Sequence, residues 1–356
     1  MKSIQIISKQ GPYGAEHIFI AQVKALKESG HEFIVVTKED KGWVSDRLKA
    51  LGIEFIPLSL KSVKDLFILR KTIKAHRIDL IHSMLDRADN FAFFLSFLCR
   101  VPIVTTSMVP RTQFIFRFFD KVICLSNKQR RFLHQSGIRE NNIEILYPYV
   151  DIERFSNPIQ RKKEAWEKKL NVVRYDIILS HVSSLIERKN HLGSVRIVVE
   201  MRKQGANPLL IIVGGDLESD YHHYLLEEID RLNLKEHVFF TGWTDDISEL
   251  LNISNFLLLP SRDEALGIVL MEGLAAGNVL VVTQGEGGED LLALDDDIGI
   301  LYSEGNEPEI ARDMLQRHIS RRSVEISKRC REIAKVHFSQ NKYVNQLLSL
   351  YEGINV

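Results

Sequence analysis

Short apolar runs alternate with longer amphipathic stretches along nearly the whole chain of 356 residues. Between the runs, a 3.6-residue apolar period predicts helices, for example over 15–29 and 62–76. Strands alternating with helices are typical of βαβ units and a parallel sheet. The apolar runs of the first half predict strands at 3–8, 32–37, 53–57, 79–83, 102–106, 120–125 and 142–146.

The pattern is interrupted at residues 147–175. Prolines and the charged stretch 161–164 lack apolar periodicity, a composition that suits a crossing between domains. Helical stretches end the chain. The sequence therefore predicts two doubly wound Rossmann-like α/β domains that face each other across a cleft. A second series of predicted strands follows the interruption, at 176–182, 208–213, 237–240, 255–259 and 279–282.

Composition indicates a folded globular protein, with 45% hydrophobic and 26% charged residues. Cys99, Cys124 and Cys330 are widely separated and lack a C-x-x-C spacing, so neither a disulfide framework nor a zinc site is expected. A reducing compartment fits this cysteine usage best. No apolar run of about 18 residues and no signal-peptide pattern occurs, so we expect a cytoplasmic protein.

The charges balance, with 47 basic and 47 acidic residues, which argues against a dedicated nucleic-acid binder. The balance conceals a split. Residues 1–150 hold 23 Lys and Arg against 14 Asp and Glu, a net +9, whereas residues 151–356 hold 24 against 33, a net −9. The basic half is expected to attract an anionic partner, such as a phosphate-bearing molecule or an anionic membrane surface.

The strongest chemical signal lies at residues 260–277. A predicted strand ends at Pro260, and a helix is expected to begin near Gly267, where unpaired backbone amides suit a phosphate or sugar oxygen. Glu264 precedes this helix and Glu272 lies within it. Together the two carboxylates could bind different parts of one extended ligand. Alternatively, Glu264 could cap the helix and Glu272 could be a solvated surface residue. Because Glu272 has apolar neighbours along the helix, an unpaired carboxylate there would be costly, which favours a ligand-binding role.

Here the sequence resembles the retaining glycosyltransferases of family four, which have the GT-B fold. PSRDEALGIVLMEGLAAGNVLVVT is similar to the E-x7-E signature of that family. The order and spacing of the motifs are specific, although each is weak alone, and together they cover nearly the whole chain. The other segments that resemble the family are, in order, GPYGAEHIFIAQVKAL, VICLSNKQRRFLHQSGI, ILYPYVDIERF, HVSSLIERKNH, IIVGGD and FFTGW.

The resemblance implies an acceptor-side domain over 1–155, a nucleotide-sugar-binding domain over 156–338, and a C-terminal helix over 339–356 that returns to the first domain. It implies retaining transfer of a hexosyl group from a nucleotide-diphosphate sugar to a hydroxyl of a glycan or lipid-linked acceptor. Bacterial surface polysaccharide or lipopolysaccharide synthesis would be the setting. The donor diphosphate would take the acceptor's proton, so no enzymic nucleophile, metal or other cofactor is implied.

The resemblance also assigns roles within the helix segment. Glu272 would bind the nucleotide ribose hydroxyls, and Glu264 the donor sugar. Backbone amides around Gly267, Ile268 and Val269 would meet the sugar and the diphosphate.

Cationic and glycine-rich positions would complete the donor site. Lys189 would neutralise the diphosphate and assist catalysis, with Arg188 as a competing ligand. A solvated lysine at a helix start is the alternative for Lys189. Gly214 and Gly215 would form a tight turn beside the nucleotide, although such turns are common in α/β proteins. Trp243 would border the base or pack between domains.

Three departures from the family pattern affect the site. Ser183-Ser184 stands where the family has Gly-Arg, so Ser184 takes the place of one diphosphate cation. Met84 and Met108 replace histidines that follow the fourth and fifth strands.

Two positions in the first half are also assigned. His82 remains as a candidate catalytic residue that lines the site, or as a histidine with satisfied hydrogen bonds within the sheet. Gly14 would let the first domain approach the diphosphate.

Eight of the 18 phenylalanines fall within residues 91–119. The segment 111–119 mixes arginines with aromatics in a way that suits a membrane interface, with Phe116 and Phe119 as candidate contacts. Packing of 114–119 under a loop is equally compatible, and 91–99 is expected to be a buried helix. A peripheral contact with an anionic membrane, at the inner face of the cell membrane, follows if the first interpretation holds.

Other readings stay open at this point. A nucleotide-sugar epimerase of the same fold would isomerise a sugar without an acceptor, and a degenerate paralogue would bind nucleotide without catalysis. The acidic run 295–297 resembles a metal motif of another glycosyltransferase fold, but its turn-like context favours a solvated loop.

Overall fold

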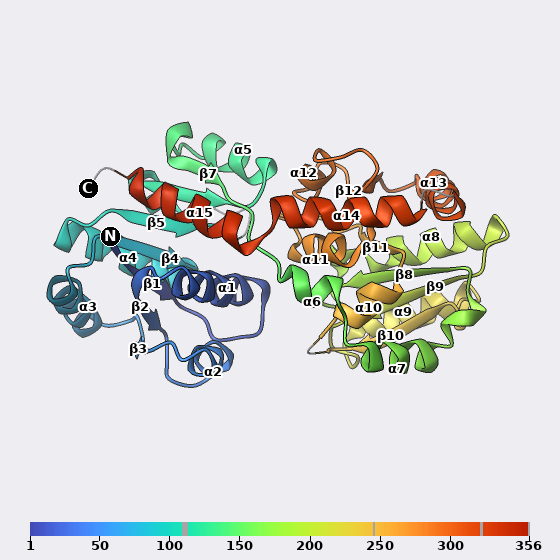
Figure 1. The fold of residues 1–356 in the computed structure, drawn as a ribbon, viewed down its shortest axis with the longest axis horizontal. Helices are drawn as coiled ribbons and strands as arrows, with labels where there is room; N and C mark the ends of the chain where they lie inside the picture. The colour runs from blue at the N-terminus through green and yellow to red at the C-terminus, as the bar shows by residue number, and fades with distance from the viewer. Residues whose placement is uncertain (109–112, 245, 321–322, 355–356) are drawn as a thin grey trace. The chain divides into compact units, whose positions relative to one another are not determined.

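The computed structural model describes residues 1–108, 113–244, 246–320 and 323–354. The chain forms two compact units, one built from residues 1–149 and 340–356 and the other from 150–339. Each unit contains one parallel sheet with helices packed against it (Figure 1). The units are described separately below.

Unit 1 has a seven-stranded sheet in the order β3-β2-β1-β4-β5-β6-β7, in which all neighbouring strands are parallel. These strands confirm the seven predicted from the apolar runs of the first half. Isoleucine and valine side chains dominate the strands, as expected where both faces of a parallel sheet are covered by helices. The strands are β1 (Lys2–Ile7), β2 (Glu32–Thr37), β3 (Phe55–Pro57), β4 (Leu80–Met84), β5 (Ile103–Thr106), β6 (Lys121–Cys124) and β7 (Ile143–Ile145).

The helices of unit 1 begin and end at recognisable signals. Ser62 caps α3 with its side chain, and the Asp65 side chain accepts from the Ser62 backbone amide in return, which satisfies two amides at the helix start. The helices are α1 (Gly14–Glu28), α2 (Trp43–Ala50), α3 (Val63–His76), α4 (Asp86–Cys99), α5 (Asn127–Gln135) and α15 (Gln340–Glu352), with 3₁₀ turns η1 (Phe114–Phe118) and η2 (Glu140–Asn142).

Helix α15 completes the core of unit 1 although it lies at the far end of the sequence. It packs against α1, to which the buried Tyr343 is hydrogen-bonded, and its buried Tyr351 reaches the sheet. The Tyr343 hydroxyl donates to Gln22 Oε1 at 2.8 Å, and the Tyr351 hydroxyl lies 2.5 Å from His82 Nδ1. The last helix is therefore an integral part of the first unit.

Unit 2 has a six-stranded parallel sheet in the order β10-β9-β8-β11-β12-β13. Five of the six strands were predicted. The sixth, at the sheet edge, was missed because its four residues follow an acidic run and its only strand partner is β12. The strands are β8 (Ile177–Val182), β9 (Pro208–Val213), β10 (Val238–Gly242), β11 (Phe256–Leu259), β12 (Val279–Thr283) and β13 (Gly299–Tyr302).

The helices of unit 2 surround this sheet (Figure 1). They are α6 (Ile152–Ser156), α7 (Gln160–Leu170), α8 (His191–Lys203), α9 (Asp220–Arg231), α10 (Ser248–Ile253), α11 (Ile268–Ala276), α12 (Glu289–Leu292), α13 (Glu307–Ile319) and α14 (Ser323–His337), with 3₁₀ turns η3 (Val172–Arg174) and η4 (Glu187–Lys189).

The interrupted segment 147–175 is more ordered than its sequence predicts. The charged stretch 161–164 belongs to α7, which buries Leu170 and part of Trp166 against the sheet and exposes its charges. The change of unit falls at 149/150, whereas the sequence suggested 155/156. The difference arises because α6 packs against α10 and α11 and so belongs to unit 2.

Both sheets share one order, 3-2-1-4-5-6 in the sequence of their own strands, with a seventh strand added in unit 1. In sheets of this order, ligands bind beyond the carboxyl ends of the strands where the winding reverses. In unit 2 the reversal lies between β8 and β11. The loops that follow these two strands are therefore the first place to look for a site.

Candidate active site

The loops after β8 and β11 are joined by backbone and side-chain hydrogen bonds. Asn190 Nδ2 donates to the carbonyl of Pro260 at 3.1 Å, and the Arg262 amide donates to the carbonyl of Arg188 at 2.8 Å. Arg188 also donates from Nη1 to the carbonyl of Asp263 at 3.1 Å. The segment 188–190 and the segment 260–263 thus form one connected edge of the site.

Two cations meet one carboxylate at this edge. Lys189 Nζ bonds the Glu264 carboxylate directly, and Arg188 Nη1 lies 3.9 Å from the same oxygen. The Lys189 and Glu264 side chains are only 13% and 16% exposed. A second carboxylate, Glu286, accepts from the Glu264 backbone amide at 2.6 Å, so the edge places two cations beside two carboxylates.

Helix α11 begins at this edge with an unusual backbone. Its N-cap, Gly267, has φ of 81°, and a Cβ there would lie 2.5 Å from a Leu259 methyl group. Glycine is therefore required for the chain to enter the helix this close to β11. The helix contacts its neighbours on most of its surface, and the residues that stay partly open are Gly267, Ile268, Val269 and Glu272. These are the four α11 positions assigned to the donor.

Glu272 is a half-buried carboxylate without a hydrogen-bond partner among the described residues. Burial raises the pKa of Glu272 to about 7, while nearby Arg154 lowers it and nearby Asp246 raises it further. An open carboxylate in an otherwise apolar helix is destabilising unless a ligand satisfies it.

Two buried histidines support the segment after β8, and the sequence analysis did not identify them. His181 and His191 stack with ring centroids 4.1 Å apart. The Ser183 hydroxyl lies 3.1 Å from His181 Nε2 and 3.0 Å from His191 Nε2. Burial lowers the pKa of both imidazoles, to about 3 for His191, so both are neutral. No short sequence motif marks this cluster, because His181, Ser183 and His191 come together only when the chain folds.

The remaining predicted donor residues of unit 2 lie at the same edge of the sheet. Gly214 and Gly215 follow β9 with positive φ, and a Cβ on Gly214 would lie 2.8 Å from the carbonyl oxygen of Ser183. Ser184 is exposed beside this turn. Trp243 follows β10, and its ring is largely exposed. The structure thus gathers the predicted residues of the second half at one edge.

The two predicted residues of unit 1 are placed differently. His82 is buried in β4, and its ring nitrogens lie 2.5 Å from the Tyr351 hydroxyl and 2.8 Å from Thr106 Oγ1. Burial lowers the pKa of His82 to about 3. His82 is thus a neutral, hydrogen-bonded core histidine, which matches the second of the two roles left open for it, a histidine with satisfied hydrogen bonds within the sheet. Gly14 is exposed at the first residue of α1.

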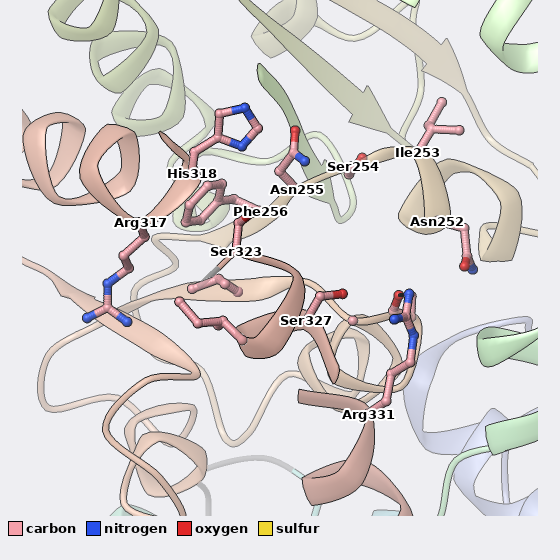
Figure 2. Close-up of a pocket in the computed structure, with 14 residues that line it drawn as sticks. Asn252, Ile253, Ser254, Asn255, Phe256, Arg317, His318, Ser323, Ser327 and Arg331 are labelled. Carbon is pink, nitrogen blue, oxygen red and sulfur yellow. Dashed lines mark hydrogen bonds between the residues drawn. The ribbon is translucent and has the colours of Figure 1, made fainter. Parts of the chain in front are cut away.

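A hollow of about 190 Å³ lies at the opposite, amino-terminal edge of the second sheet. Figure 2 shows Arg317 and Arg331 on different sides of it. Arg331 donates to the carbonyl of Ala276, and Arg317 donates to Asp313 and to the carbonyl of Asp297. Because it lies at the opposite edge of the sheet from the loops that follow β8 and β11, the hollow is not part of the candidate site.

The acidic run 295–297 also has a structural role. Asp295 accepts from Arg329 at 2.7 Å and from the amide of Asp297, and these bonds lower the pKa of Asp295. Within the described part of the chain, no group of three or more His, Cys, Asp or Glu side chains is placed to hold a metal ion.

The aromatic segment of unit 1 divides differently from the sequence expectation. Phe116 and Phe119, the proposed membrane contacts, are buried in the core, while α4, expected to be buried, exposes several side chains. Arg111 and Thr112 lie outside the described residues. We call the exposed set the aromatic face, and it consists of Phe94, Phe97, Leu98, Phe114 and Phe118. None of the described helices is long and apolar enough to span a bilayer.

Two family sequence models match this chain. One, described as Glycosyltransferase Family 4, covers residues 12–154, and the other, described as Glycosyl transferases group 1, covers residues 162–337. Together they account for nearly all of both units. The chain belongs to glycosyltransferase family four.

Two curated relatives of this glycosyltransferase are named for transfer to a sugar linked to diphospho-undecaprenol. The Escherichia coli UDP-Gal:alpha-D-GlcNAc-diphosphoundecaprenol alpha-1,3-galactosyltransferase is 21% identical over 95% of this chain and 93% of its own. A Campylobacter jejuni N,N'-diacetylbacillosaminyl-diphospho-undecaprenol alpha-1,3-N-acetylgalactosaminyltransferase is 25% identical over 76% of this chain and 78% of its own.

Solved structures confirm the fold. Anabaena Alr3699/HepE in complex with UDP superposes with a TM-score of 0.86 at 20% identity, over 99% of this chain and 100% of that one. A Rickettsia africae glycosyltransferase superposes with a TM-score of 0.87 at 20% identity, over 99% and 98%. The GT-B fold predicted from the sequence is therefore confirmed.

The open carboxylate of Glu272 predicts a stability cost in the free enzyme. Because folding raises its pKa from 4.5 to about 7, the folded state binds a proton more tightly, and stability falls as pH rises through this window. We expect Glu272→Gln to raise the free energy of unfolding by about 1–3 kcal/mol near pH 8, and by almost nothing near pH 4. Urea denaturation at both pH values measures this, and a variant no more stable than wild type near pH 8 would contradict it.

Proposed function

We propose that this glycosyltransferase is a retaining, metal-independent enzyme that moves a hexosyl group from a nucleotide-diphosphate sugar to a hydroxyl of a lipid-linked acceptor. The observation that carries the proposal is the open Glu272 carboxylate, which lies on the helix that follows Glu264, the partner of Lys189 and Arg188. Such a helix offers hydrogen-bond acceptors for a nucleoside and donors for a diphosphate.

The spacing along α11 matches an extended donor. Glu272 lies four positions after Ile268, which is a distance of about 6 Å along the helix axis. Glu272 would accept hydrogen bonds from the ribose hydroxyls, while the amides of Ile268 and Val269 would donate to the diphosphate. Glu264 lies before the helix, where it would bind a hydroxyl of the sugar.

The cations would act where charge develops. As the bond from the anomeric carbon to the diphosphate oxygen breaks, the leaving nucleoside diphosphate gains negative charge, which Lys189 and Arg188 stabilise. The acceptor hydroxyl attacks from the face that the diphosphate leaves, and its proton passes to a diphosphate oxygen. No protein nucleophile is needed. Arg188 would supply the second cation, because Ser184 stands where the family has an arginine.

A lipid-linked acceptor is supported by the names of the relatives and by the aromatic face. Both relatives are named for diphosphoundecaprenol-linked acceptors. Surface polysaccharide or lipopolysaccharide synthesis at the cytoplasmic side of the cell membrane is the setting that we propose. An epimerase is disfavoured because the glycosyltransferase relatives transfer a sugar to an acceptor.

The aromatic face has the chemistry of a membrane-interface contact. Phe97 is 85% exposed and Phe114 is 69% exposed. Four of the rings in this region are connected through half-buried Phe93, because Phe118 lies 5.6 Å from Phe114 and 5.7 Å from Phe93, and Phe93 lies 5.6 Å from Phe94, measured between centroids. Arg117 lies over the Phe114 ring at 5.2 Å. Exposed aromatics beside arginine suit the headgroup region of an anionic bilayer, which the basic residues 1–150 would also attract.

Removal of the Glu272 carboxylate should weaken donor binding. Glu272→Ala deletes charge-assisted hydrogen bonds to the ribose, so affinity for the nucleoside diphosphate should fall by about 1.5–3 kcal/mol. Calorimetric titration with UDP, GDP, ADP and dTDP measures this effect. Glu325→Ala, an exposed glutamate on α14, is the matched control and should bind as wild type does. Unchanged affinity in Glu272→Ala would reject the donor assignment.

Loss of the Lys189 cation should slow the chemical step more than binding. We expect Lys189→Ala to lower turnover by roughly 100- to 1000-fold, as removal of a group that stabilises transition-state charge does. Release of nucleoside diphosphate in the presence of acceptor measures turnover, and Lys203→Ala at the other end of α8 is the control. Near-normal turnover would transfer the role to Arg188.

The aromatic face should be needed for binding to anionic vesicles. We expect wild type to co-sediment with vesicles that contain phosphatidylglycerol more than with phosphatidylcholine alone, and Phe97→Ser/Phe118→Ser to lose most of this binding. Val173→Ser/Ile319→Ser removes equally exposed apolar side chains from unit 2 and should bind as wild type does. Equal binding by both double variants would exclude this face.

A further inference from the structure

Helix α6 lies against the part of α11 that carries Glu272. The Ser156 hydroxyl donates to the carbonyl of Ala275 at 3.2 Å, and Ala275 lies three residues after Glu272, on the same side of the helix. Asn252 Nδ2 donates to the carbonyl of Phe155 at 2.7 Å, which holds α6 to α10 as well. This short helix is thus fixed on two sides.

The position of α6 brings an ion pair close to the open carboxylate. Arg154 Nη2 lies 3.0 Å from Asp246 Oδ1, with the two side chains 44% and 27% exposed. Asp246 is itself held by the amide of Ser248 at 2.9 Å, at the start of α10. Both charges act on Glu272, Arg154 favouring its ionised form and Asp246 opposing it.

Among the residues that the structure describes, Arg154 and Asp246 are the charged groups that shift the pKa of Glu272. Of the neighbouring helices, α6 also carries Glu153, which accepts from Asn157, and α10 carries the buried Glu249. Helix α14 reaches α11 through Arg331, which donates to the carbonyl of Ala276 at the carboxyl end. The strands β11 and β12, which also pack against α11, carry no charged side chains.

We propose that Arg154 is a positioning residue for the donor: on a helix packed against α11 and held by Asp246, its guanidinium supplies the positive charge that favours the ionised Glu272 carboxylate, the form that accepts hydrogen bonds from a nucleoside. The inference rests on the proposed role of Glu272. It assigns a function to the segment between the two predicted domains, which had seemed only a connection. Because Arg154 and Asp246 have opposite charges, their removal must affect Glu272 in opposite directions.

That opposition separates an electrostatic role from a structural one. Arg154→Met and Asp246→Asn break the same ion pair, so a purely structural effect would be similar in both. If the charges act on Glu272, Arg154→Met shifts the pH midpoint of nucleotide binding upward, and Asp246→Asn shifts it downward. Each shift should be about 0.5–1 pH unit, less than the 1–3 units caused by a close, well-buried opposite charge, because Arg154 is partly exposed.

The measurement is calorimetric affinity for UDP from acidic to alkaline pH, with the full-length chain. The phosphates of UDP titrate too, but they do so equally in every variant, so differences between midpoints report the protein. Glu272→Gln removes the titrating group, so the pH dependence that remains should come from the phosphates. Arg154→Lys keeps the positive charge and should therefore keep the wild-type midpoint. Arg174→Met, which breaks an exposed ion pair with Glu236 elsewhere in unit 2, should not move it.

The outcomes distinguish this inference from the function on which it rests. If wild type binds none of UDP, GDP, ADP and dTDP, both fail; if it prefers one of the last three, that nucleotide replaces UDP as the probe. If wild type binds and Glu272→Ala does not, but the two midpoints stay together or move in the same direction, the role of Arg154 is rejected and the donor site stands.

Discussion

The pairing of β8 with β11 is the constraint on which the candidate site depends. These strands are far apart in sequence but adjacent in the sheet, so the loops that follow them share one edge. Asn190 and Arg262 then join the two loops by hydrogen bonds. Lys189, Glu264 and the start of α11 are thereby held together by the protein's own hydrogen bonds, which favours a preorganised candidate site.

The same edge contains groups that a purely structural region would avoid. Glu272 is half-buried and has no hydrogen-bond partner among the described residues, and His181 and His191 are neutral histidines that stack on each other. The two histidines share the Ser183 hydroxyl, which fixes the turn after β8 although the chain lacks the family's Gly-Arg there. Structural precision at this turn and the loss of stability at Glu272 both favour binding of a charged, hydroxyl-rich ligand.

Much of this could be predicted from the sequence, because the determinants are local. Twelve of the 13 strands in the described residues follow from apolar runs, and the candidate donor residues of unit 2 follow from motifs next to strand ends. What could not be predicted depends on tertiary contacts. His82 was left between two roles, which burial against Tyr351 decides. For Phe116 two alternatives were open, and its packing against Phe119 in the core decides for burial, whereas Phe97, expected to be buried, is exposed on α4.

The helix α15 has a consequence for the order in which the protein forms. Unit 2 is continuous in sequence, from 150 to 339. Unit 1, in contrast, needs the residues that follow 339, because Tyr351 of α15 packs over β1 and β4. During synthesis, domains near the amino terminus usually fold first. In this chain, the first unit to emerge from the ribosome is the last whose core is closed, and its sheet must stay partly uncovered until translation of the second unit is finished.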